Sequence, residues 1–206
     1  VGADDSAHQP HYRYFMALAN GHKEKQDYAG LDVESENLTT AFEWALTADA
    51  GSALWLASEC IGFLANRGRF RQAVEWFLRV ISALAEDATE LRAQAQNGLG
   101  NAYRNLAQIE DQDGNLRHAI AAYTEALPYR TPAGAPLDYA MTQNNLGNAY
   151  GDLAAIEDRE VNLRSAIEAY TAALQYRTPD VAPLDYAMTQ NNFGTAYSDL
   201  AEIEDL

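Results

Sequence analysis

The nine residues LDYAMTQNN occur twice in this chain, at 137–145 and 184–192, with every amide unchanged. Hydrophobic packing requires similar volumes, whereas repeated amides indicate a polar role. A primary amide carries both a donor and an acceptor, so it can pair with both polar groups of a peptide unit. These side chains are therefore candidates for recognising a peptide backbone. The alternative is that they cap neighbouring helices or bond one another between repeats, copied by duplication.

The residues that usually perform catalysis are not arranged for it. Four histidines are scattered among polar residues, and no nucleophile–base set can be assembled. The acidic triplet Ile-Glu-Asp at 109–111, 156–158 and 203–205 lacks a calcium-loop pattern and is interpreted as solvated helix-end acids. The single cysteine, Cys60, lies in an apolar run, which indicates a buried thiol. We expect no enzyme, no metal and no cofactor.

Composition narrows the class of partner. The 206 residues are 48% hydrophobic and include 30 acidic against 14 basic side chains, a formal charge of −16. Such a surface repels nucleic acid and anionic membranes and suits basic or neutral partners, although it also serves solubility. No segment is long enough to span a bilayer and no secretory signal is visible, so we expect a cytoplasmic protein.

The chain repeats with a period of 47 residues. Residues 137–159 and 184–206 agree at 18 of 23 positions, and residues 115–137 and 162–184 agree at 17 of 23. Each period contains two amphipathic helical patterns, separated from the next period by RTPAGAP or RTPDVAP. Asn115 and Asn162 are predicted N-caps of the second helix. Pro128 should end its copy of that helix early, because Gln175 occupies the equivalent position later.

The small and aromatic residues of each period resemble the tetratricopeptide repeat. The pattern comprises LGNAY followed by A-x3-Y-x2-A, and its members are Leu146, Gly147, Tyr150, Ala166, Tyr170 and Ala173, with Leu99, Gly100, Tyr103, Ala119, Tyr123 and Ala126 one period earlier. The resemblance implies an all-α, right-handed α-solenoid of antiparallel helix pairs, whose concave face is lined by the first helices. The usual unit is extended to 47 residues, and we expect about two extra turns in the first helix.

The N-terminal third follows another pattern. We expect residues 1–10 to be a flexible terminus, 11–50 a helical base and 51–87 a degenerate repeat of ordinary length. Residues 88–206 then form the elongated units, the last one ending after its first helix, so we expect a longer array. The tryptophans Trp44, Trp55 and Trp76 are predicted to form a core, with a ligand cage as the alternative.

Residues 11–80 resemble the helical segment that follows the nucleotide-binding and winged-helix domains of STAND-class signalling ATPases. The resemblance lies in HYRYFMALA, LDVESENLTTAFEWAL and FLANRGRFRQAVEWF, and its key residues are Tyr14, Phe15, Glu36, Asn37, Leu38, Ala41, Trp44, Ala45 and Leu46. It implies an upstream nucleotide-binding domain, since no phosphate-loop motif occurs in these 206 residues.

The repeat resemblance also places the candidate site. Groove-lining positions of the first helix recur about every four residues and stack into two columns rich in amides. They are Asn97, Asn101 and Asn105, then Asn144, Asn148 and Asp152, then Asn191, Thr195 and Asp199. Related arrays hold extended peptides with asparagines at matching positions.

We therefore expect a protein- or peptide-binding sensor arm of a STAND-type ATPase, with bacterial defence as a candidate setting. Trigger binding would release autoinhibition by favouring the open form. One alternative is a free-standing scaffold for protein complexes. Another is the small-molecule sensor of a transcription activator.

Overall fold

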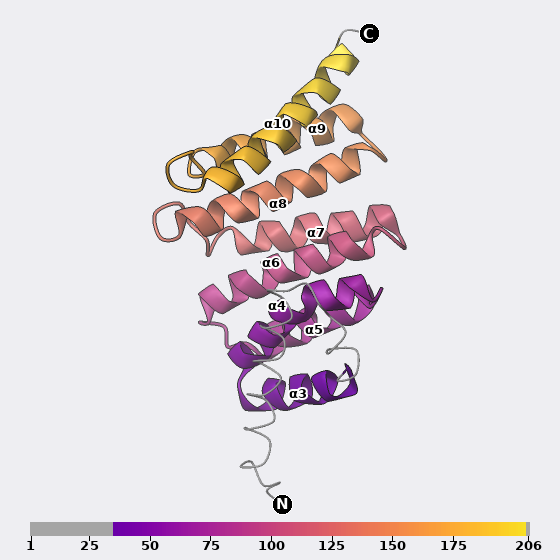
Figure 1. Cartoon of the computed structure of the whole chain (residues 1–206), viewed down its shortest axis with the longest axis vertical. Helices are drawn as coiled ribbons and strands as arrows, with labels where there is room; N and C mark the ends of the chain where they lie inside the picture. Colours follow the sequence, from indigo (N-terminus) through magenta and orange to yellow (C-terminus); the bar gives the residue numbers. More distant parts are fainter. Residues whose placement is uncertain (1–34, 205–206) are drawn as a thin grey trace, which may run out of the picture. The chain divides into compact units, whose positions relative to one another are not determined.

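The computed structural model describes residues 35–204 and places eight α-helices there, with no strand in that range (Figure 1). These helices belong to two compact units, residues 1–91 and 92–206. The all-α prediction is confirmed, and the helices are paired as an α-solenoid requires. The expected helix over residues 11–25, with Tyr14 and Phe15, lies outside the described residues. Between residues 35 and 204, no helix is long and apolar enough to cross a membrane.

The first unit contains three described helices. They are α3 (Ser35–Ala48), α4 (Ala50–Asn66) and α5 (Phe70–Ala83). Asp49 caps α4, because its carboxylate accepts two backbone N–H bonds of the first turn, at 3.2 and 2.9 Å. Gly68 turns the chain between α4 and α5 with φ of 68°, a left-handed conformation that glycine adopts without a steric cost.

The aromatic core of the first unit is smaller than predicted. Trp76 of α5 is 2% exposed and stacks on Phe42 of α3, with ring centroids 4.2 Å apart. Trp44 and Trp55 are only half-buried. The predicted three-tryptophan core is therefore wrong in two of its members. Cys60 of α4 is fully buried, as predicted, and burial raises the pKa of its thiol to about 12.

The second unit contains the repeats. Its helices are α6 (Thr89–Leu106, the first turn of which belongs to the first unit), α7 (Gln112–Ala126), α8 (Pro136–Ala154), α9 (Arg159–Leu174) and α10 (Pro183–Glu204). We call α6, α8 and α10 the first helices of their repeats, and α7 and α9 the second helices. In Figure 1 α8 lies between α7 and α9, and α10 packs on α9.

Proline sets several of these boundaries. Pro136 and Pro183 open α8 and α10 at the first helical position, where the missing N–H costs no hydrogen bond. The second helix α7 ends at Ala126, one position earlier than α9, which ends at Leu174. The early end predicted from Pro128 is confirmed.

The predicted N-caps of the second helices are wrong. Asp111 and Asp158 occupy those positions, in left-handed conformations with φ of 38° and 42°. Asn115 and Asn162 lie one turn inside, where each donates from Nδ2 to a carbonyl before the helix, at 2.8 Å. Aspartate tolerates the left-handed region better than most residues, so the repeated Ile-Glu-Asp ends in the turn itself.

The extra length of each repeat is also placed differently from the prediction. Helix α8 ends four residues after Tyr150, and α9 already begins at Arg159, seven residues before Ala166. The left-handed Asp158 between them reverses the chain. The added residues are therefore shared by both helices and their turn, rather than extending the first helix by about two turns.

Glycine makes the close contact between the helices of a pair. A Cβ added at Gly147 would lie 2.6 Å from the ring of Tyr170, and one at Gly100 would lie 2.4 Å from the ring of Tyr123. Both tyrosines are buried in the cores of their repeats. At Gly194 of α10, in contrast, nothing lies within 4 Å of an added Cβ.

We expect Gly147→Ala and Gly194→Ala to change stability in opposite directions. The first forces Tyr170 to shift in a packed core, at a cost of about 1–3 kcal/mol. The second adds a better helix former in open space and should stabilise by about 0.5–1 kcal/mol. Chemical denaturation of the two variants measures both effects. Equal effects of the two substitutions would contradict the glycine–tyrosine contact.

Candidate functional site

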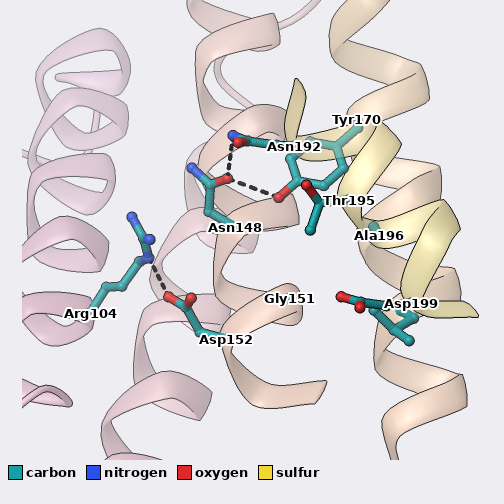
Figure 2. Close-up of a pocket in the computed structure, with 10 residues that line it drawn as sticks. Arg104, Asn148, Gly151, Asp152, Tyr170, Asn192, Thr195, Ala196 and Asp199 are labelled. Atoms are coloured by element: carbon teal, nitrogen blue, oxygen red, sulfur yellow. Dashed lines mark hydrogen bonds and ion pairs between the residues drawn. The ribbon is translucent and has the colours of Figure 1, made fainter. Parts of the chain in front are cut away.

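The second unit has a groove where its first helices run past Gly151 (Figure 2). Three adjoining hollows of 270, 290 and 300 Å³ share this glycine. We define the groove by six polar or small residues that line them. They are Arg104, Asn148, Gly151, Asp152, Thr195 and Asp199.

The groove is open at Gly151 because no side chain fills it. A Cβ added there would come no closer than 3.9 Å to another side-chain atom, the Oη of Tyr170. The equivalent positions of α6 and α10 carry Arg104 and Ser198. The same helix face is therefore filled by a guanidinium in one repeat and left empty in the next.

Asn148 has its carbonyl oxygen engaged and its NH₂ group free of protein partners. Its Oδ1 accepts from the hydroxyl of Tyr170 at 2.8 Å and from Nδ2 of Asn192 at 2.9 Å (Figure 2). Within residues 35–204, Nδ2 of Asn148 has no hydrogen-bond partner. Asn101 repeats half of this arrangement, since its Oδ1 accepts from Tyr123 at 2.8 Å.

Burial keeps the two tyrosines protonated. Desolvation raises the pKa of Tyr170 to about 12 and that of Tyr123 still further. Each phenol therefore remains a hydrogen-bond donor at neutral pH, and each amide oxygen remains its acceptor. This fixes the orientation of the Asn101 and Asn148 side chains.

Two carboxylates of the groove are paired with arginines. Nε of Arg104 donates to Asp152 at 2.6 Å, and Arg159 lies 3.6 Å from Asp199. Arg104 and Asp152 are 37% and 43% exposed, so water screens their attraction. An exposed pair of this kind contributes ~0–1 kcal/mol, which leaves both groups able to exchange partners.

A second set of polar residues connects successive repeats in the interior. Nη1 of Arg177 donates to Oγ1 of Thr189 at 2.9 Å, and that oxygen lies 3.0 Å from Oδ1 of Asn144. One repeat earlier Arg130, Thr142 and Asn97 make the same contacts at 3.2 and 3.4 Å. We call each set an arginine–threonine–asparagine chain.

These chains are buried. Arg130 and Arg177 are 3% and 6% exposed, and both threonines are fully buried. Desolvation lowers the pKa of Arg177, while the Asp185 carboxylate 3.9 Å away opposes that shift. A buried guanidinium is costly unless it is hydrogen-bonded, so the threonine hydroxyl is a structural partner.

The structure therefore separates the nine predicted site residues. Asn97 and Asn144 are 7% and 6% exposed and bond to the following repeat, so their placement as groove contacts is wrong for this conformation. This is the arrangement that the alternative interpretation of the repeated amides describes. The first of the two predicted amide columns therefore faces the interior at these two positions.

The other seven residues remain candidate contacts. Asn148, Asp152, Thr195 and Asp199 come together in the groove. Asn101 and Asn105 are half-buried on α6, and Asn191 is exposed on α10. The structure does not bring Asn105 or Asn191 into the groove around Gly151.

Sequence reasoning missed the arginines and the glycine of the site. Arg130 and Arg177 stand in the repeated Tyr-Arg-Thr-Pro, and the same 47-residue period places a threonine in both copies of LDYAMTQNN. That shared period was the signal for the buried chains. Gly151 had no such signal, because its equivalents are Arg104 and Ser198. Within residues 35–204, no group of three metal-binding side chains occurs.

We expect Asn144→Ala to destabilise the protein, while Asn191→Ala leaves stability unchanged or slightly higher. Removing the buried amide leaves the hydroxyl of Thr189 without one acceptor, at a cost of about 1–3 kcal/mol. Asn191 occupies the same position of the same nine residues but is exposed. Thermal unfolding of both variants measures the difference. Equal stability would mean that the interior chain contributes nothing.

No family model matches the sequence, and no curated protein matches it. Among solved structures, the chain is similar to BtubC (BKLC) from P. vanneervenii, with a TM-score of 0.62 and 18% sequence identity. The match covers 97% of this chain and 84% of that one. At this identity the likeness supports the helical fold alone.

Proposed function

We propose that the second unit binds an extended peptide segment of a partner protein in the groove around Gly151. The observation that carries this proposal is the amide of Asn148, whose NH₂ group has no hydrogen-bond partner within residues 35–204 and lines an open polar hollow. Because its carbonyl is held by two donors, the amide is already oriented before a ligand arrives. Preorganised polar groups lose less entropy on binding.

A peptide backbone suits this donor. A backbone carbonyl would accept from Nδ2 of Asn148, and the next peptide units of an extended chain follow at about 3.3 Å per residue. Asn101 offers the same group one repeat earlier. The groove thus supports main-chain recognition, with side chains of the ligand selecting the partner.

The charges of the groove favour a ligand with a basic side chain. Asp152 and Asp199 lie on neighbouring first helices and are held by exposed arginines. A ligand arginine or lysine can replace such a partner with little loss, since exposed pairs are weak. The formal charge of −16 attracts the same ligands from a distance.

Random peptides displayed on phage and selected against the chain test the groove. Gly151→Gln fills the hollow with a good helix former and should weaken binding of selected peptides by ~tenfold or more, without loss of stability. Gly134→Gln is the matched control, because that loop residue is exposed and the next repeat carries Val181 there. Peptides that bind Gly151→Gln as well as the wild type place the site elsewhere.

We further propose that these repeats are elongated tetratricopeptide units and that they act as a STAND-type sensor arm. The glycine–tyrosine contact is the support for the first statement. The resemblance of residues 11–80 supports the second, and its members Leu38, Ala41 and Ala45 form the buried face of α3. Peptide binding would then shift a nucleotide-binding domain between two conformations.

The coding sequence upstream of Val1 distinguishes a sensor from a scaffold. We expect a phosphate-loop motif there, and nucleotide hydrolysis by the full-length protein that changes when a selected peptide is added. Hydrolysis that is indifferent to the peptide, or an upstream region without a phosphate loop, would favour the scaffold.

A further inference from the structure

Helix α10 repeats the sequence of α8 but leaves exposed the face that α8 buries. Residues 137–145 and 184–192 are identical, so the two helices present the same side chains. In α8 this face is covered by α9, whereas in α10 it lies open. The buried residues of α8 are Ala140, Asn144, Gly147 and Ala154, and their exposed equivalents in α10 are Ala187, Asn191, Gly194 and Ala201.

The contact that closes this face in α8 is known in detail. The ring of Tyr170 lies directly against Gly147, where an added Cβ would meet it at 2.6 Å. The pair Gly100 and Tyr123 repeats the contact. The corresponding space beside Gly194 is empty within 4 Å. A tyrosine-sized space is therefore filled twice and open once.

Aromatic residues flank the open space. Tyr197 is 49% exposed and packs edge-on against Phe193, with centroids 4.7 Å apart. Phe193 is half-buried, although its equivalent Leu146 is only 8% exposed. The face thus combines an exposed aromatic pair with a glycine that admits close approach of another helix. We call it the α10 face, defined by Ala187, Gly194, Phe193, Tyr197 and Ala201.

We infer that the α10 face binds an amphipathic helix of a partner protein that carries alanine and tyrosine at the spacing of α9. That spacing is Ala-x3-Tyr-x2-Ala, given in α9 by Ala166, Tyr170 and Ala173. The alanines allow the helices to approach, and the tyrosine enters the space beside Gly194. The interface continues the packing by which α9 covers α8.

A second copy of this chain fits the face less well. The complement of a first helix is a second helix, and both described second helices of the repeats are occupied. Their inward alanines, Ala119 and Ala166, are fully buried, and Tyr123 and Tyr170 are 0% and 4% exposed. A copy could offer them only by opening its own core. A partner helix avoids that cost, so the face favours a heterologous complex.

A peptide of residues 158–177, which contains α9 and its capping aspartate, is the probe for this interaction. Labelled at its N-terminus and titrated with the chain, it should bind and show saturable fluorescence anisotropy. The Tyr170→Ala peptide should lose ~tenfold or more in affinity, because the space beside Gly194 stays empty. A Glu168→Ala peptide is its control, since that residue is exposed on α9.

Gly194→Ala in the chain should weaken binding of the unaltered peptide by a similar factor while the variant stays folded. An added Cβ enters the space that the tyrosine ring needs, but meets no atom in the free chain. Gly134→Ala is the matched control. Absence of binding, or equal binding by Gly194→Ala, overturns the proposal. Self-association of the chain that Gly194→Ala abolishes also overturns it, in favour of a second copy.

Discussion

The repeats depend on the contact between a glycine of the first helix and a tyrosine ring of the second. With no side chain at Gly147, the ring of Tyr170 lies against the backbone of α8 and its hydroxyl reaches Asn148. The apolar ring fills the core and the phenol orients an amide at the groove. One close approach therefore sets both the packing of the helix pair and the position of the candidate ligand donor.

The polar residues of the repeat divide into two groups with different roles. The arginine–threonine–asparagine chains lie in the interior, where a buried guanidinium and hydroxyl need partners with defined geometry. They fix how one repeat stacks on the next, since the donor and the acceptor come from neighbouring repeats. The residues around Gly151 are partly exposed, and their exchangeable ion pairs leave a surface that a ligand can enter.

The 47-residue period alone predicted the helices, their order and the glycine–tyrosine pattern, because these follow from apolar spacing and from proline. It could not predict which amides face the interior. Asn144 and Asn148 lie one turn apart on the same helix, yet only the first is buried. The difference arises from Thr189 in the next repeat, which has no signature within α8. The turn at Asp158 was missed for a similar reason, since asparagine is the better-known helix cap.

Identical sequence in α8 and α10 does not give identical chemistry. The amide of Asn144 accepts from an interior threonine, whereas that of Asn191 is exposed at the same position of the same nine residues. What a residue does in such an array is decided by whether another helix follows it. A repeated motif therefore serves stability where it is covered and recognition where it is open, and α10 is where this chain presents the motif uncovered.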